Sequence, residues 1–255
     1  MFPSHLTIFT LLFLRYLVVA GIAFLLFYLL FPIRFKKKKI QQKFPKRNDY
    51  FREISYSILT VIIFTGISIL LASSLVKPHT RIYNHISDYG KVYFFVSIFL
   101  ALLIHDTYFY WTHRLMHHPR LFKLFHLTHH RSTNPSPWAA YAFNPLEAVV
   151  EGGTIFAIAF IIPIHFLAIV IFMLIMIIYN VYGHLGYEIY SYGFLKSKIG
   201  KWLNTSTNHN IHHKYFIGNY GLYFRFWDEW MGTTHPQYEE TLSELLTKEK
   251  KESVL

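Results

Sequence analysis

The chain has 255 residues, of which 53% are hydrophobic, 19% aromatic and only 15% charged, a composition typical of membrane proteins. A formal net charge of +11 is common in nucleic-acid-binding proteins, but here the basic residues lie beside apolar segments. That arrangement favours anionic lipid headgroups, and we expect no nucleic-acid partner. The chain has no cysteine, which excludes disulfides and thiolate sites, so any metal must be held by nitrogen or oxygen ligands.

The first part of the chain predicts two membrane-spanning helices joined by a basic loop. Residues 6–31 are apolar apart from Arg15 and are long enough to span a bilayer. This segment is too long for a signal-peptide core and lacks a small-residue cleavage site, so we expect a retained helix. Residues 34–52 contain nine Lys or Arg, which favours the cytoplasmic side for this loop. Residues 54–76 predict the second span.

A third span is predicted at residues 91–111, and it returns the chain from the connection at 77–91 to the cytoplasmic side. Pro119 ends this helix. One helix face carries four chemically useful residues at spacings of four, three and four: Asp106, Tyr110, His113 and His117. A carboxylate two turns before a pair of ligands can orient them, although Asp106 can equally be a polar residue at the end of a span.

Histidine clusters are the most informative feature of the sequence. Seven of the sixteen histidines lie between His105 and His130. The spacings HxxxH and HxxHH place imidazoles on one face of a helix, so each cluster is expected to point at one position. The three clusters are His113/His117, His126/His129/His130 and His209/His212/His213. Their eight imidazoles are enough for two metal ions with about four protein ligands each.

Residues 146–181 are apolar, with Pro163 near the middle, and hydropathy alone allows either one long span or a hairpin. We expect the hairpin, because a single crossing would put residues 209–213 on the opposite membrane face from His113. The predicted fold is an all-α membrane bundle of about four hydrophobic segments. A cytoplasmic helical cap carries the His-rich di-metal site. The charged C-terminal tail predicts a short helix capped by Thr241 and Glu244.

Sequence motifs in this order are similar to those of the fatty acid hydroxylase/sterol desaturase superfamily. The resemblance covers about residues 90–235. It rests on HD-x-x-x-Y-W-x-HRLMHH, then FHLTHH, then HNIHH followed by NYG and WD. The segment PSPWAAYAFNPLEA also resembles sterol C5-desaturases, which typically have histidines where this chain has Tyr141 and Asn144.

The resemblance implies a catalytic domain at 90–235, preceded by transmembrane helices and a basic loop at 1–89 and followed by a charged tail at 236–255. It implies two iron ions, which zinc can replace, with O2 as co-substrate. The implied metal ligands are His113, His117, His126, His129, His130, His184, His209, His212 and His213. The residues assigned to orient these ligands are Asp106, Tyr110 and Asp228.

The expected function is therefore a membrane-bound, O2-dependent di-iron oxidoreductase that hydroxylates or desaturates a C–H site of a sterol-like or fatty acyl lipid. The sequence has no dinucleotide-binding, P-loop or iron–sulfur motif, so an external electron donor is implied, such as cytochrome b5, a ferredoxin or a reductase. The alternative is a membrane metal-binding or metal-transport protein without redox catalysis. Against transport, the clusters lie past the span ends instead of near the bilayer midplane. A metalloprotease requires a glutamate inside its histidine motif, and none of the three clusters has one.

Overall fold

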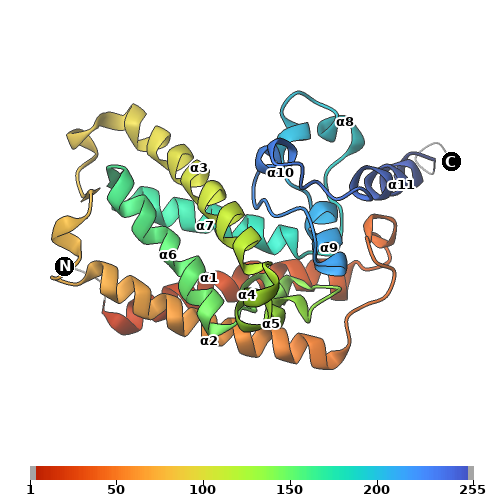
Figure 1. Cartoon of the computed structure of the whole chain (residues 1–255), viewed down its shortest axis with the longest axis horizontal. Helices are drawn as coiled ribbons and strands as arrows, with labels where there is room; N and C mark the ends of the chain where they lie inside the picture. Colours follow the sequence, from red (N-terminus) through yellow and green to blue (C-terminus); the bar gives the residue numbers. More distant parts are fainter. Residues whose placement is uncertain (1–3, 252–255) are drawn as a thin grey trace.

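The computed structural model describes residues 4–251, and this part of the chain is mostly helical, with two very short strands (Figure 1). Its long elements are α1 (His5–Phe24, continued by the π-helical η1, Leu25–Leu30), α2 (Arg47–Ala72), α3 (Gly90–Met116), α6 (Pro145–Ile161) and α7 (Phe166–Gly183). Among the described residues, four helical segments are long and apolar enough to cross a membrane: His5–Leu30, Arg47–Ala72, Gly90–Met116 and Phe166–Gly183. The predicted all-α membrane bundle is confirmed.

Short helices and loops connect the long helices. The short helices are η2 (Lys36–Lys38), η3 (Lys77–His79), η4 (Ile86–Asp88), α4 (Pro119–Phe125), α5 (Leu127–His130), η5 (Pro137–Tyr141), α8 (Tyr192–Leu195), η6 (Gly200–Trp202), α9 (Ser206–Tyr215) and α10 (Phe226–Trp230). The last helix, α11, spans Tyr238–Lys251, so the predicted helix start at Thr241 is wrong. Tyr238 and Leu242 of α11 pack against Leu195 and Ile211, and this contact places the helix start before Thr241.

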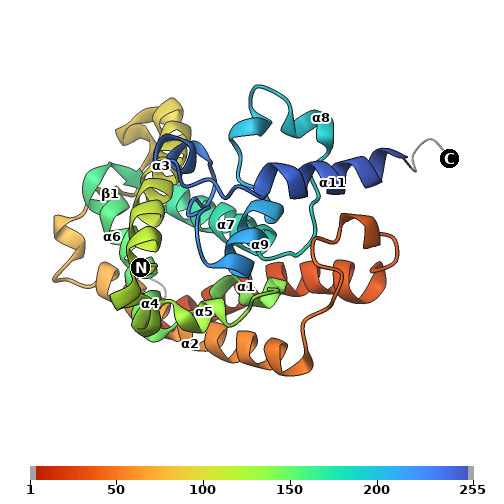
Figure 2. The ribbon, with the colours of Figure 1, turned by 45° about the vertical axis from the view of Figure 1, so that its right-hand side comes forward.

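The hairpin at Pro163 is present. Helix α6 ends at Ile161, and α7 begins at Phe166 with the ring of His165 as its N-cap. Between them, β2 (Ile164–His165) pairs in parallel with β1 (Ile82–Tyr83). This pairing fixes the hairpin turn to the connection between α2 and α3. Both free ends of the hairpin therefore lie at the other end of the bundle, beside α4, α5 and α9 (Figures 1 and 2).

Small side chains let the helices pack closely. Ala101 of α3, Ile158 of α6 and Ala168 of α7 belong to one buried cluster. A second cluster joins α1, α2, α7 and η5 around Tyr16 and Val61. Without a strong hydrophobic drive between helices in lipid, such close packing provides much of the attraction between spans.

The outer faces of the bundle are apolar, with exposed side chains that include Leu11, Ile62, Phe99 and Val170. Such a surface is stable against lipid and unfavourable against water. Arg15, the one charged residue in the first span, faces inward, where its Nη2 donates to the hydroxyl of Tyr141 at 3.1 Å. The chain is an integral membrane protein.

Candidate metal centre

The structure brings the nine histidines together in two groups. Group one contains His113 and His117 at the end of α3, His126 and His130 around α5, and His212 of α9. Group two contains His129 of α5, His184 at the end of α7, and His209 and His213 of α9. Within each group the potential ligand atoms all lie within 4.8 Å of one another.

Each HxxHH cluster contributes to both groups, which differs from the expectation that its three imidazoles share one position. His126 and His130 lie in group one, and His129 lies in group two. In α9 the i, i+4 pair His209 and His213 belongs to group two, whereas the intervening His212 belongs to group one. The reason is geometric, because adjacent helix positions differ by about 100° around the axis. Two neighbouring histidines therefore face two different sites.

In group two the Nε2 atoms converge on one point. The Nε2 of His209 lies 3.0 Å from that of His184 and 3.1 Å from that of His213. The Nε2 of His184 lies 3.2 Å from those of His213 and His129. The edge of a tetrahedron around an ion with metal–nitrogen bonds of about 2.0 Å measures about 3.3 Å. The spacing of these four nitrogens therefore fits a metal ion.

The hydrogen bonds of the Nδ1 atoms, on the opposite side of the imidazole rings, also indicate a metal site in group two. The Nδ1 of His184 donates to the carbonyl of Asn180 at 2.8 Å, and that of His213 donates to the carbonyl of Ser132 at 3.0 Å. A carbonyl only accepts, so each Nδ1 carries the proton and each Nε2 presents a lone pair. Lone pairs that face one another at 3.2 Å repel unless a cation lies between them.

In group one, too, Nδ1 atoms donate to backbone carbonyls. The Nδ1 of His113 donates to the carbonyl of Tyr220 at 2.9 Å, and that of His212 donates to the carbonyl of Gly218 at 2.7 Å. The Nε2 atoms of His126 and His212 are buried and have no hydrogen-bond partner. Unsatisfied buried nitrogens are costly, and a bound cation would satisfy them.

Glu147 is a residue of the site that the sequence analysis missed. Its Oε1 accepts the Nδ1 proton of His126 at 2.7 Å, and both side chains are buried. A carboxylate in this position fixes the tautomer and the orientation of a ligating imidazole. Glu147 lies in the first turn of α6, 21 residues after His126, and no local spacing connects the two.

Within residues 4–251, Asp106, Tyr110 and Asp228 form no hydrogen bond with a histidine of either group. They hold the segment 218–233 instead. Asp106 accepts from the backbone N–H of Tyr223 at 2.7 Å, and Asp228 accepts from that of Tyr220 at 2.8 Å. The hydroxyl of Tyr110 lies 3.0 Å from that of Thr233. These residues therefore hold the loop whose carbonyls, at Gly218 and Tyr220, accept from His212 and His113. Gly218 belongs to that loop at φ +71°, where a Cβ would lie 2.7 Å from the carbonyl oxygen of Thr233.

Three further histidines near the clusters have other partners. The Nδ1 of His105 lies 2.8 Å from the hydroxyl of Tyr223. His118 and His235 accept backbone N–H groups of Arg120 and Gln237. Neither metal group includes any of the three.

Burial keeps the imidazoles neutral. It lowers the pKa of His184 to about 4, mainly through desolvation. Desolvation, with added repulsion between neighbouring rings, holds the pKa well below its usual range for His126, His129, His130, His209, His212 and His213. Neutral imidazole is the form that binds a metal ion.

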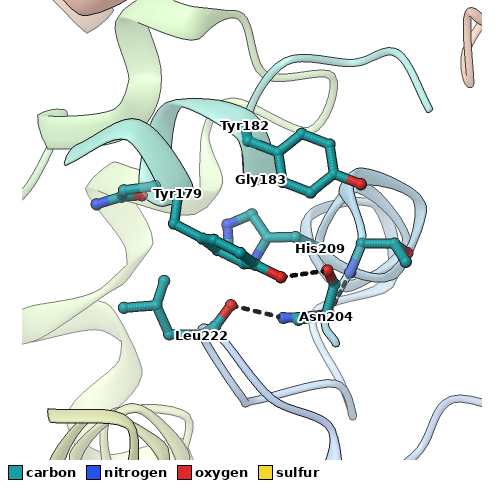
Figure 3. A pocket seen from close by; sticks show the side chains of 8 residues that line it. Tyr179, Tyr182, Gly183, Asn204, His209 and Leu222 are labelled. Carbon is teal, nitrogen blue, oxygen red and sulfur yellow. Dashed lines mark hydrogen bonds between the residues drawn. The ribbon is translucent and has the colours of Figure 1, made fainter. Parts of the chain in front are cut away.

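A small pocket adjoins group two on the side of His209 (Figure 3). The hydroxyl of Tyr179 donates to the carbonyl of Asn204 at 2.7 Å, and the amide of Asn204 donates to the carbonyl of Leu222 at 3.2 Å. These bonds join the end of α7 to the segment before α9 and to the 218–225 loop. Three separate parts of the chain thereby form and hold the side of the pocket next to His209.

Comparison with known proteins connects this site to a family. A Delta(7)-sterol 5(6)-desaturase of Gibberella zeae is 29% identical over 78% of this chain and 57% of its own length. Lathosterol oxidase of Homo sapiens is 28% identical over 71% of this chain and 60% of its own length. This chain thus spans about three fifths of the length of these relatives. No solved structure matches it.

The model of the fatty acid hydroxylase family matches residues 98–233, which is more than half of the chain. The match includes all nine histidines of the two groups as well as Glu147. The chain belongs to the fatty acid hydroxylase family, and within it the chain is similar to sterol C5-desaturases.

Proposed function

We propose that the protein is a membrane-bound oxidoreductase that uses O2 to hydroxylate or desaturate a C–H site of a sterol-like or fatty acyl lipid. The observation that carries the proposal is the pair of buried, all-imidazole groups at one end of an apolar helical bundle. The names of the relatives, desaturase and oxidase, favour redox chemistry over metal transport.

Two iron ions, one in each group, are the proposed cofactor, and zinc can occupy the same nitrogen ligands. Iron would supply the O2 chemistry that protein side chains lack. The chain itself contributes three things. The carbonyls and Glu147 fix the imidazole tautomers, burial excludes water, and the bundle holds the lipid beside the histidines. We assign Asp106, Tyr110 and Asp228 a supporting role through the 218–233 segment.

Electrons must come from a separate protein, and we propose that the site faces the cytoplasm. The basic loop after the first span contacts the histidine-bearing end of the bundle. The Nε2 of Gln41 donates to the side-chain oxygen of Asn210 at 2.9 Å and to the carbonyl of Thr133 at 2.8 Å. Basic loops beside membrane spans stay cytoplasmic, so this contact supports the same side for both metal groups. A cytochrome b5, a ferredoxin or a reductase is then the expected donor.

The lipid profile of cells with and without the gene tests the proposal. We expect one lipid class to lack an oxygen atom or to retain a pair of hydrogens when the gene is absent. Cells that express His129→Ala at the same membrane level provide the control, because this variant should leave the lipids as in the deletion. An identical lipid profile in all three cell lines would contradict the proposed activity.

A further inference from the structure

A cavity inside the bundle lies apart from both metal groups. It is lined by α2, α3, α6 and α7, mostly with apolar side chains such as Phe64, Phe172 and Met176. Polar side chains also reach it, among them Glu151 and Thr154 of α6. A carboxyl group within an apolar helical bundle is expensive and is usually retained for a function.

Two of the polar side chains at this cavity, Glu151 and Thr154, have no hydrogen-bond partner among the described residues. The carboxyl of Glu151 makes no hydrogen bond within residues 4–251. The Oγ1 of Thr154 is buried and also has no partner. By contrast, the hydroxyl of Ser68, at the same cavity, donates to the carbonyl of Phe64 in its own helix at 2.8 Å. Glu151 and Thr154 are three residues apart on α6, so their side chains share one helix face. Together they offer an acceptor and a hydroxyl to a molecule in the cavity.

The position of the cavity connects it to the metal groups. Glu151 lies four residues after Glu147, whose carboxyl holds His126. Met176 lies eight residues before His184 on α7. With a rise of 1.5 Å per residue, these separations are about 6 and 12 Å along the helix axes. A hydroxyl group bound at Glu151 would therefore lie about one helix turn along α6 from the carboxyl that holds His126.

We propose that Glu151 and Thr154 form a subsite that hydrogen-bonds a hydroxyl group of the lipid substrate. This inference rests on the proposed function, since it places the substrate of the same site. The Glu151 carboxyl accepts the O–H of the lipid, and the Thr154 hydroxyl donates to its oxygen. The other walls contact its hydrocarbon.

Equilibrium binding tests the subsite without requiring turnover. The full-length protein in lipid nanodiscs is given two matched pairs of tritiated probes: cholest-7-en-3β-ol with cholest-7-ene, and octadecan-1-ol with octadecane. For at least one pair we expect the alcohol to bind about 10-fold or more tightly than the hydrocarbon. Glu151→Leu should bring this ratio close to one. Thr154→Val, which keeps the side-chain shape, should reduce it, and Glu151→Gln, which still accepts a hydrogen bond, should largely preserve it.

Thr65→Val is the matched control, because the Thr65 hydroxyl donates to the carbonyl of Val61 in its own helix. It should leave the ratio unchanged. A wild-type ratio near one, binding of none of the probes, or a ratio that Thr154→Val and Glu151→Leu leave intact would overturn the subsite. A buried water at Glu151 would give this last result. If cells with the gene oxidise a lipid but the variants leave the alcohol-to-hydrocarbon binding ratio unaltered, only the subsite is refuted. If the binding ratio depends on Glu151 but no lipid is oxidised in cells, only the proposed oxidoreductase is refuted.

Discussion

Removing the hydrogen bond between Glu147 and His126 should weaken one metal group selectively. The bond is 2.7 Å long, and both side chains are buried. Losing such an outer partner costs about 10- to 100-fold in metal affinity, or about 1.4 to 2.8 kcal/mol. Glu147→Gln keeps an oxygen that can accept, so we expect a loss of about 10-fold. Glu147→Ala leaves the Nδ1 proton of His126 without a partner, so we expect a loss of about 100-fold.

The assay is metal content at equilibrium with metal buffers of graded free concentration, measured by elemental analysis of the purified protein. In the Glu147 variants the midpoint of one ion should shift, while the second ion, held by group two, keeps its midpoint. Glu151→Gln is the control, since Glu151 is on the same helix and forms no hydrogen bond with a histidine of the described chain. Equal shifts of both ions, or a shift as large in the control, would refute the role assigned to Glu147.

Three further predictions concern the whole site. Purified protein should hold close to two metal ions, with iron in the active form, and elemental analysis that finds no stoichiometric metal would contradict the metal centre. Labelling of single introduced cysteines should reach residues 200–215 and Lys36–Lys39 from the same membrane side, and opposite sides would refute the proposed orientation. His129→Ala should abolish lipid oxidation with little loss of membrane-inserted protein. His165→Ala removes an N-cap, worth about 1 kcal/mol, and the hydrogen bond from Nε2 to the carbonyl of Asn84. This variant should keep both metal and activity. Wild-type turnover in His129→Ala would disprove the role of His129 as a ligand.

Most of the site could be predicted from the spacing of histidines along the sequence. The i, i+4 pairs identified His113 with His117 and His209 with His213, because such neighbours share a helix face whatever the rest of the fold. The hairpin at Pro163 followed from the requirement that distant clusters meet. The division into five and four histidines did not follow, since it depends on how α5 and α9 are rotated against each other. Glu147 was missed because its contact with His126 is made by tertiary packing alone.

The arrangement of group two has a consequence for a chain that has no cysteine. His184 and His209 are 25 residues apart, and an ion between them would close the segment 185–208 as a disulfide closes a loop. His129 and His213 would attach the same ion to α5 and α9. The ions would thus act as reversible cross-links across the end of the bundle. Their removal should loosen this end and expose 185–208 to proteases, while the spans stay folded in the bilayer.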